Sequence, residues 1–250
     1  MSKIESFHAI EILDSRGRPT LKTTCELSSG ITAFASVPSG ASTGKAEALE
    51  LRDGDKKRFR GLGCLKAVNN VNTILNNSLS GLELSQETLD KKMLELDGTA
   101  NKFNLGAHAI LSVSLAFARA CALEQSLQLY QYFANILGNA APRLPRLTVN
   151  LFSGGKHAGG QVVIQDLLVV PQANSISDAL AMTYEIYQCA AELTAKKYNI
   201  RSLRADEGGL APPFPNVTVM IEDALQAIQQ AGLKAGQDVS LALDVASSHF

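Results

Sequence analysis

Positions 4–27 read IESFHAIEIL, DSRGRP and TLKTTCEL in succession, and these three stretches decide the fold of the N-terminal half. Residues 4–13 and 20–27 are rich in β-branched and apolar side chains, which favour strands, and the polar stretch between them is typical of a turn. A third apolar stretch, residues 31–37, follows Ser28-Ser29-Gly30. The simplest arrangement of three strands joined in this way is an antiparallel meander.

The residues after this meander follow a helical period. Within residues 62–75 the apolar side chains recur at every third or fourth position, as they do on one face of a helix. Ser85 can cap a second helix, and residues 105–125 are apolar nearly all round, which predicts a central buried helix. With a further short helix over residues 127–137, the first half is predicted to be an α+β domain.

Residues 138–145 (GNAAPRLP) predict a domain boundary, because they contain one glycine and two prolines between helical and strand-like patterns. We therefore expect a first domain over residues 1–138 and a second over residues 139–250.

The second domain alternates between strand-like and helical patterns. Strands are expected at residues 147–152, 162–170 and 239–245, and helices at residues 175–198 and 217–232. This alternation predicts a parallel sheet or an (α/β) barrel. The 112 residues after Gly138 are too few for a complete barrel, which takes about 200 residues or more, so only part of one is expected.

The composition bears on partners and location. Lys and Arg total 23 against 24 Asp and Glu, a formal net charge of -1, which gives no reason to expect a nucleic-acid partner. The N-terminus lacks the apolar run of a signal peptide, and polar side chains interrupt the most apolar stretch, residues 105–123, so no membrane partner is expected. The four cysteines form no C-x-x-C pair, which suits a cytoplasmic protein.

Two loops of small residues can bring polar groups to a ligand. Residues 36–44 (SVPSGASTG) follow a predicted strand and contain Ser39, but they lack the spacing of a Walker phosphate loop. Residues 153–160 (SGGKHAGG) place His157 among glycines after another predicted strand, where barrels build their sites. The alternatives are an ordinary flexible loop and a solvated histidine.

Polar side chains in apolar surroundings supply further candidates. Gln165 and Asp166 lie inside a predicted apolar strand, where burial is costly unless they are paired or used. Glu207 lies in DEGG, where glycines allow close approach and a carboxylate can act as a general acid. Asp244 ends an apolar strand and is a candidate ligand for Mg²⁺, which prefers oxygen. The alternatives are a strand edge that reaches water, an ordinary turn, and a capping or ion-paired aspartate.

Together these segments resemble the enolase family. The motifs that carry the resemblance, in chain order, are LDSRGxPT (13–20), VPSGASTG (37–44), EALELRDGD (47–55), LKAV (65–68), DGT (97–99), LGA (105–107), GGKHA (154–158), DEGG (206–209) and ALDVA (242–246). They cover the whole chain but match only the N-terminal part of the family's length.

The resemblance implies a fold and a reaction. The fold is α/β, with an α+β cap domain followed by part of an enolase-type barrel. The reaction is the glycolytic, reversible dehydration of 2-phosphoglycerate to phosphoenolpyruvate, a small phosphorylated carboxylic acid, with Mg²⁺ as the cofactor. The positions that match the family's site are Glu207 as the catalytic acid, His157, Gln165 and Asp166 as substrate-binding residues, and Asp244 and Ser39 as metal ligands. A homodimer is also expected.

Departures from the family motivate two alternatives. The family usually has Asn at Ser153, Asn or a similar residue at Gly160, and Glu at Asp166. These changes motivate a paralogue that acts on another phosphorylated or phosphonate carboxylic acid. The family's base lysine, its other metal carboxylates and its phosphate-binding arginine belong to a later part of the barrel. We therefore expect residues 1–250 alone to be inactive, and a non-catalytic enolase-like protein is the second alternative.

Overall fold

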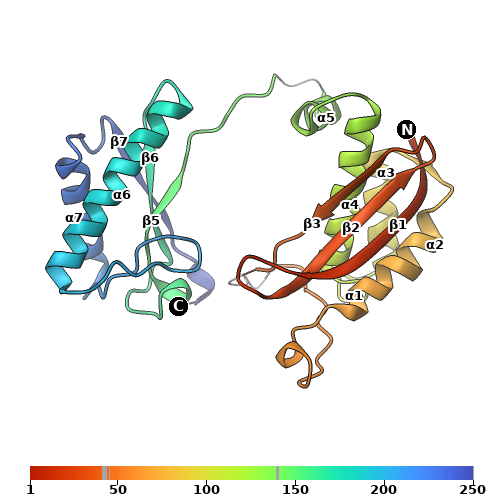
Figure 1. Ribbon diagram of the computed structural model, residues 1–250, viewed down its shortest axis with the longest axis horizontal. Coiled ribbons are helices and arrows are strands. Elements are labelled where there is room, and N and C mark those ends of the chain that lie inside the picture. Colours follow the sequence, from red (N-terminus) through yellow and green to blue (C-terminus); the bar gives the residue numbers. More distant parts are fainter. Residues whose placement is uncertain (41–43, 45, 139–140, 250) are drawn as a thin grey trace. The chain divides into compact units, whose positions relative to one another are not determined.

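The computed structural model describes residues 1–40, 44, 46–138 and 141–249. The chain divides into two compact units, Met1–Arg143 and Leu144–Phe250 (Figure 1). The division falls inside residues 138–145, the stretch with one glycine and two prolines. The expected boundary after Gly138 is followed by Asn139 and Ala140, which lie outside the described residues.

The first unit is built on an antiparallel sheet. Its strands are β1 (Ser2–Leu13), β2 (Pro19–Leu27), β3 (Thr32–Ser36) and the two-residue β4 (Glu83–Leu84), in the order β3-β2-β1-β4. The predicted three-stranded meander is therefore confirmed. β4 was not predicted, because two residues are too few to show a period.

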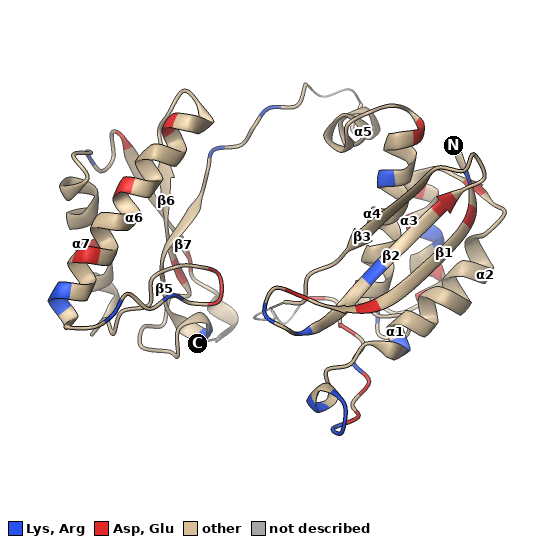
Figure 2. Ribbon diagram, in the orientation of Figure 1, with Lys and Arg blue, Asp and Glu red and all other residues tan. Residues whose placement is uncertain are grey.

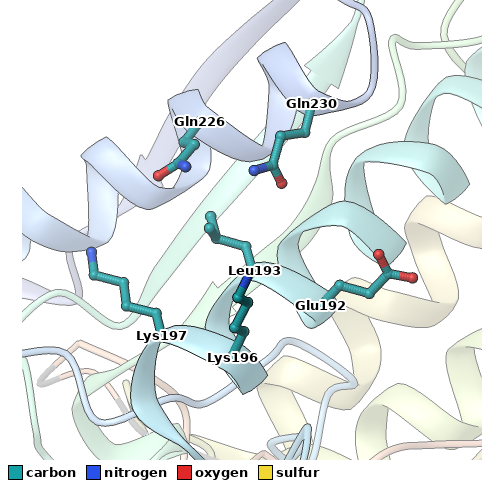
Figure 3. A pocket seen from close by; sticks show the side chains of 6 residues that line it. All are labelled: Glu192, Leu193, Lys196, Lys197, Gln226 and Gln230. Atoms are coloured by element: carbon teal, nitrogen blue, oxygen red, sulfur yellow. The ribbon is translucent and has the colours of Figure 1, made fainter.

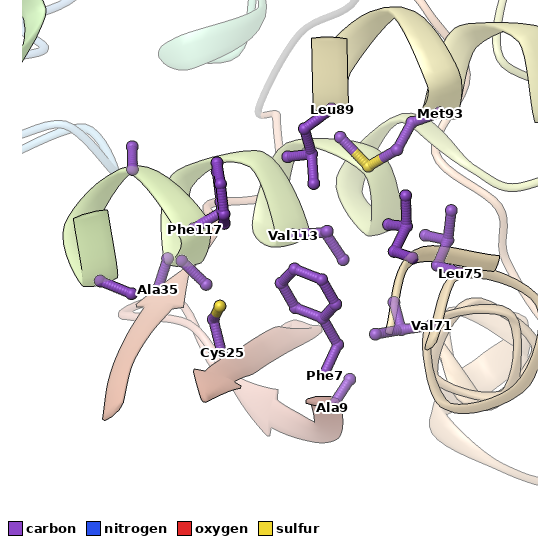
Figure 4. Close-up of a cluster of buried hydrophobic side chains, with 14 of the residues drawn as sticks. Phe7, Ala9, Cys25, Ala35, Val71, Leu75, Leu89, Met93, Val113 and Phe117 are labelled. Atoms are coloured by element: carbon purple, nitrogen blue, oxygen red, sulfur yellow. The ribbon is translucent and has the colours of Figure 1, made fainter. Parts of the chain in front are cut away.

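One face of this sheet is covered by helices, and no helix in the described part of the first unit lies on the other face (Figure 1). Alternate residues of β1 face the helices, as the period of a half-buried strand requires. A bulge between Ile4 and Ser6 shifts this period by one residue, so that both Ile4 and Phe7 are buried. Figure 4 shows Phe7 and Ala9 packed against Val71, Val113 and their neighbours on the covering helices.

After a short 3₁₀ turn (Phe59–Gly61), the helices of the first unit are α1 (Leu65–Asn70), a π-helical turn (Val71–Leu75), α2 (Asn76–Leu79), α3 (Gln86–Asp97), α4 (Ala107–Glu124) and α5 (Leu129–Ile136). α1, the π-helical turn and α2 are continuous, so the helix predicted from Leu62 begins three residues later and extends to Leu79. Its start is fixed by a distant residue, because the carboxylate of Asp53 accepts hydrogen bonds from the backbone N–H groups of Leu65 and Lys66. Ser85 caps α3 as predicted, accepting a bond from the N–H of Thr88.

α4 is the central helix of the first unit, as its composition predicted. It is long and apolar enough to cross a membrane, with a mean hydropathy of 1.3, and 56% of that span is buried inside the structure. A buried polar contact with the sheet joins the hydroxyls of Thr23 and Ser112 at 2.7 Å. α4 therefore has the burial of a core helix in a folded domain.

The second unit contains a three-stranded sheet in the order β5-β6-β7, with β5 at Val149–Ser153, β6 at Asp166–Pro171 and β7 at Val239–Asp244. Both strand pairs are antiparallel, so the expectation of parallel neighbours is wrong. The reason is the connection. Two helices, α6 (Ile176–Tyr198) and α7 (Val217–Gln230), follow β6 in succession, and two helical passes return the chain antiparallel to β6.

Two strand boundaries also differ from the expectation. The strand expected from Val162 begins only at Asp166, because residues 161–165 form an irregular segment. β7 was expected to be buried, yet most of its residues are half-buried or exposed. The predicted Ser175 cap is confirmed, since its hydroxyl accepts a bond from the N–H of Asp178, and α7 ends before Gly232 as expected.

Candidate active site

The candidate site lies at one end of the second unit's sheet. Ser153 is paired with Asp166 across β5 and β6, and Asp166 is paired with Asp244 across β6 and β7. Side chains paired directly across neighbouring strands lie on the same face of a sheet, about 5 Å apart. The register therefore gathers a hydroxyl and two carboxylates on adjacent strands.

Asp166 is buried and strongly hydrogen-bonded. Its Oδ1 accepts bonds from Asn150 Nδ2 at 2.6 Å and from Ser153 Oγ at 2.9 Å, and the residue is 4% exposed. Burying a carboxylate is costly unless donors replace its water. The alternative of a strand-edge residue that reaches water is therefore wrong for Asp166.

His157 faces two carboxylates. Its Nδ1 lies 3.3 Å from Asp166 Oδ2 and 3.7 Å from Glu207 Oε2, and only 5% of its side chain is exposed. The solvated loop histidine is therefore the wrong alternative as well. Glu207 reaches the same point with a side chain that is 49% exposed, so the group is open to solvent on the Glu207 side.

The loop that carries Glu207 is a tight turn held at several points. The N–H of Ala205 donates to the carbonyl of Gly209, and the N–H of Gly208 donates to the carbonyl of Ala205. Tyr187, on α6, donates its hydroxyl to the carbonyl of Gly208 at 2.7 Å. DEGG is thus a turn that brings Glu207 to the candidate site, and Figure 2 shows acidic residues in this loop between α6 and α7.

Gly209 allows this loop to lie against β5. A Cβ at this position would meet Ser153 Oγ at 2.4 Å and Asn150 Oδ1 at 2.6 Å, both too close for a real contact. Only glycine permits such an approach. The second glycine of DEGG therefore brings the Glu207 loop against the side chains that hold Asp166.

Gln165 and Asp244 form a second contact beside this group. Gln165 Nε2 donates to Asp244 Oδ2 at 3.2 Å, and Gln165 is 5% exposed. Asp244 is exposed, and its Oδ1 accepts a bond from the N–H of Ala246 at 3.1 Å. Asp244 thus makes a local capping contact and still presents carboxylate oxygen to a ligand.

Unpartnered polar atoms gather around these residues. Within the described part of the chain, Asn150 Oδ1, His157 Nε2, Gln161 Oε1 and Gln165 Oε1 are buried and have no hydrogen-bond partner. The three amide nitrogens all donate to protein acceptors, which fixes the way each amide points. Buried polar atoms nearly always have a hydrogen-bond partner, so a group of unpartnered ones indicates a binding place for a polar ligand.

Ser39 belongs to the first unit and is held by charged neighbours. Its hydroxyl donates to Glu50 and accepts from Arg52 Nη2 at 2.6 Å, and its carbonyl accepts from Arg16. Burial alone would raise the pKa of Glu50, but the N–H of Gly40 and the guanidinium of Arg52 hold that pKa below its usual value. Residues 41–43 and 45 of the same loop lie outside the described residues.

The two halves of the chain match the two domain models of one family. Residues 4–133 match the enolase N-terminal domain, and residues 142–250 match the enolase C-terminal TIM barrel domain. The chain belongs to the enolase family. The α+β cap and the partial barrel expected from the sequence are thereby confirmed, and the family is one of lyase-type enzymes.

Sequence reasoning missed two residues of this enolase-family site. Asn150 fixes Asp166, and Tyr187 fixes the Glu207 loop. Asn150 carried a usable signal, because an amide inside the apolar stretch 147–152 is as costly to bury as Gln165 is. Tyr187 carried none, because a tyrosine within an amphipathic helix is common in a domain core.

A groove on the outer side of the second unit lies apart from this chemistry. Its volume is about 600 Å³, and Figure 3 shows that it runs between α6 and α7. Its most reactive group, Lys197, is already paired with the buried carboxylate of Asp223. None of the residues that line the groove belongs to the candidate site, which remains at the end of the sheet.

Proposed function

We propose that this enolase-family chain contributes to an Mg²⁺-dependent lyase that interconverts 2-phosphoglycerate and phosphoenolpyruvate in the glycolysis of the cytoplasm. The observation that supports this most strongly is the convergence of His157, Asp166 and Glu207 at one point. Dehydration needs a proton delivered to a departing hydroxyl, and a carboxylic acid on a site's rim can deliver it.

In this proposal Glu207 is the acid that helps the carbon-3 hydroxyl leave. Its half-exposed side chain lies on the open side of the group, where a substrate can reach it. His157 and Asp166 are held behind it and orient the substrate's polar groups. Gln165 contributes from the neighbouring position, with its carbonyl oxygen still unpartnered within the described residues.

The side chains of the chain suit Mg²⁺, which takes oxygen ligands. Asp244 would hold the ion with a carboxylate that faces solvent. By the resemblance, Ser39 would be a ligand of a second Mg²⁺ ion rather than of the ion that Asp244 would hold, since its hydroxyl and its carbonyl each keep a lone pair beyond the bonds described above. When bound, the ion would stabilise negative charge that develops on a substrate carboxylate.

A homodimer remains part of the proposal. The sheet face of the first unit that no helix covers exposes Ile10, Leu13 and Phe34, each between 46% and 54%. Exposed apolar side chains of this kind on neighbouring strands mark interaction surfaces. A small phosphorylated carboxylic acid, rather than nucleic acid or membrane, remains the proposed partner of the site.

The reaction is tested with a chimera that joins residues 1–250 to the remaining barrel of an active enolase. We expect phosphoenolpyruvate to form with Mg²⁺ and not with a chelator. Glu207→Gln should lower kcat by about a hundredfold, the usual contribution of a general acid. Glu192→Gln, which neutralises an exposed glutamate on α6, is the matched control and should leave turnover unchanged.

Residues 1–250 alone should form no phosphoenolpyruvate above background. Turnover by this chain at an ordinary enzymatic rate, about 1–1000 per second, would overturn the assignment of the base to a later barrel strand. A folded chimera with no turnover of 2-phosphoglycerate would contradict the proposed reaction and favour a binding protein derived from an enolase.

A second substrate class is favoured by the position of Asp166. Its carboxylate is one methylene shorter than the family's glutamate, and Asn150 and Ser153 hold it near the strand. A misplacement of about 1 Å can cost on the order of 100-fold in rate. In the chimera, Asp166→Glu should therefore raise kcat for 2-phosphoglycerate.

The same experiment separates the two substrates. If the chimera with Asp166 already turns over 2-phosphoglycerate rapidly and Asp166→Glu slows it, this prediction is wrong. The replacement at Ser153 has then already compensated for the shorter side chain of Asp166. If neither chimera turns over 2-phosphoglycerate but either one processes a phosphonate analogue, the paralogue is the better assignment. Steady-state kinetics on both substrates, with circular dichroism as the folding control, measure the difference.

A further inference from the structure

A groove in the first unit lies between the strand β3 and the C-terminal half of α4. Its volume is about 490 Å³, and small-molecule sites have volumes of about 300–1,000 Å³. The apolar residues that line it are Ala33, Phe34, Ala122, Leu123, Leu127 and Leu129. They come from β3, α4 and the chain that leads into α5, so the β3–α4 groove belongs to one compact unit.

Large apolar side chains stand free along this groove. Ala33 and Ala122 are buried, whereas Phe34 is 50% exposed and Leu123 is 55% exposed. Exposed apolar surface that surrounds a hollow marks a ligand-binding groove. An alkyl chain that lies against Phe34 and Leu123 would remove this surface from water, which favours binding.

Arg119 places a positive charge at one end of the β3–α4 groove. Its Nη1 donates to the carbonyl oxygen of Phe34 at 2.9 Å, which fixes the position of the guanidinium. A guanidinium carries several N–H donors, and the ion pairs of the described residues do not include Arg119. Lys22 lies nearby, with its Nζ 4.0 Å from the centre of the Phe34 ring. Two cations therefore flank Phe34, and this end of the groove attracts an anion.

The charge changes sign toward the other end of the groove. Arg119 and Leu123 are four residues apart, so they lie one turn apart on the same face of α4. Glu124 follows Leu123 in the chain, and its carboxylate accepts a bond from the hydroxyl of Ser29 at 2.6 Å. An anion would be repelled by Glu124 and attracted by Arg119. The charge pattern therefore places an anionic head at Arg119 and an apolar chain toward Leu127.

An extended peptide added to the edge of β3 fits the hydrogen bonding less well. β3 is the last strand of its sheet, and a new strand would need its outward backbone groups. The carbonyl of Phe34, in the middle of β3, is already bonded to Arg119. Arg119 thus protects this edge from strand addition, as charged side chains on edge strands commonly do.

We propose that the β3–α4 groove binds a small amphipathic carboxylate, with its carboxylate on Arg119 and its alkyl chain along Leu123 and Leu127. Guanidinium groups bind carboxylates through short, charge-assisted hydrogen bonds. The groove lies in the first unit, so this binding does not depend on the proposed lyase activity or on the site in the second unit.

The test is calorimetric titration of the 250-residue chain with decanoate. We expect one saturable site per chain. Octanoate, which is shorter by two CH₂ groups, should bind about tenfold more weakly because it removes less apolar surface from water. Octan-1-ol, which has the chain length of octanoate but no charge, should bind at least fivefold more weakly than octanoate. Decanoate should shift the amide NMR signals of residues 32–34 and 119–129.

Two variants separate the head from the chain. Arg119→Gln should weaken decanoate binding at least tenfold, whereas Lys91→Gln, which neutralises an exposed cation on α3, should leave it unchanged. Leu123→Asn keeps the guanidinium and should weaken binding about tenfold by removing apolar contact. Because Arg119 and Leu123 are both exposed, neither variant should change the melting temperature of the ligand-free chain.

Three results would overturn the proposal. The first is a folded wild-type chain with no saturable decanoate binding. The second is equal decanoate affinity in wild type and Arg119→Gln, which would place the carboxylate elsewhere. The third is a chain whose β3 amide signals shift with an acetylated pentapeptide of alternating valine and glutamate but not with decanoate, which would make the groove a strand-docking edge.

Discussion

Gly154→Ala should lower the free energy of unfolding by about 3 kcal/mol or more, the upper range for overpacking. Gly154 opens the loop that carries His157. A Cβ there would lie 2.4 Å from the carbonyl oxygen of Ile164 and 2.4 Å from Val162 Cγ2. Because one of these atoms is backbone, the loop must move, and His157 would move with it. Urea denaturation followed by circular dichroism measures the loss.

Gly159→Ala is the matched control within the same loop. Gly159 has a φ of 83° and no atom within 4 Å of a built Cβ, so alanine there suffers only the strain of a left-handed backbone. That strain costs about 1 kcal/mol. Equal losses in the two variants would show that backbone conformation, rather than close approach, explains the glycine at position 154.

Acidification from pH 7 to pH 5 should destabilise the first unit through His108, by about 2 kcal/mol at pH 5. Burial lowers the pKa of this histidine from 6.5 to about 4, with smaller effects from Glu50, Arg52 and Asp53. Between pH 6.5 and about pH 4, the unfolded chain therefore binds a proton at His108 that the folded chain does not bind. Stability is full above pH 6.5, falls as the pH drops below it, and reaches a loss of about 3 kcal/mol below pH 4.

His108→Leu removes the titrating group and should flatten this part of the profile. Neither ring nitrogen of His108 has a partner among the described residues, so leucine leaves no donor or acceptor stranded. The comparison is confined to pH 5–7, because carboxylates with lowered pKa values, such as Asp97, lose their contribution only at lower pH. Parallel profiles for wild type and variant would contradict the assignment to His108.

Local pattern was sufficient for much of the first unit. The three strands of the meander, the Ser85 cap and the buried helix α4 all follow from side-chain period and turn chemistry, which act over a few neighbouring residues. The family motifs likewise identified His157, Asp166 and Glu207 as candidates for one site. That these three side chains share a site was implied by the family resemblance, and it is the structure that brings their ligand atoms within 4.8 Å of one another.

Other features depend on contacts between distant parts of the chain. α1 begins at Leu65 because Asp53 caps it from twelve residues away. β7 runs antiparallel to β6 because two helices, rather than one, separate these strands. In both cases the local sequence pattern predicts the correct element. The residue at which a helix begins and the direction in which a strand runs depend on contacts with residues outside a short window of sequence.

The same distinction holds at the site. The sequence supplies a histidine and carboxylates, but only folding lets Asn150 and Ser153 hold one oxygen of Asp166 while His157 Nδ1 lies 3.3 Å from Oδ2 and 3.5 Å from Oδ1. It is also folding that allows Gly209 to bring the Glu207 loop against β5. Residue types determine which chemistry is available. Burial and register decide which atoms meet, because hydrogen bonds and ligand sites depend on separations of a few ångströms between residues far apart in the chain.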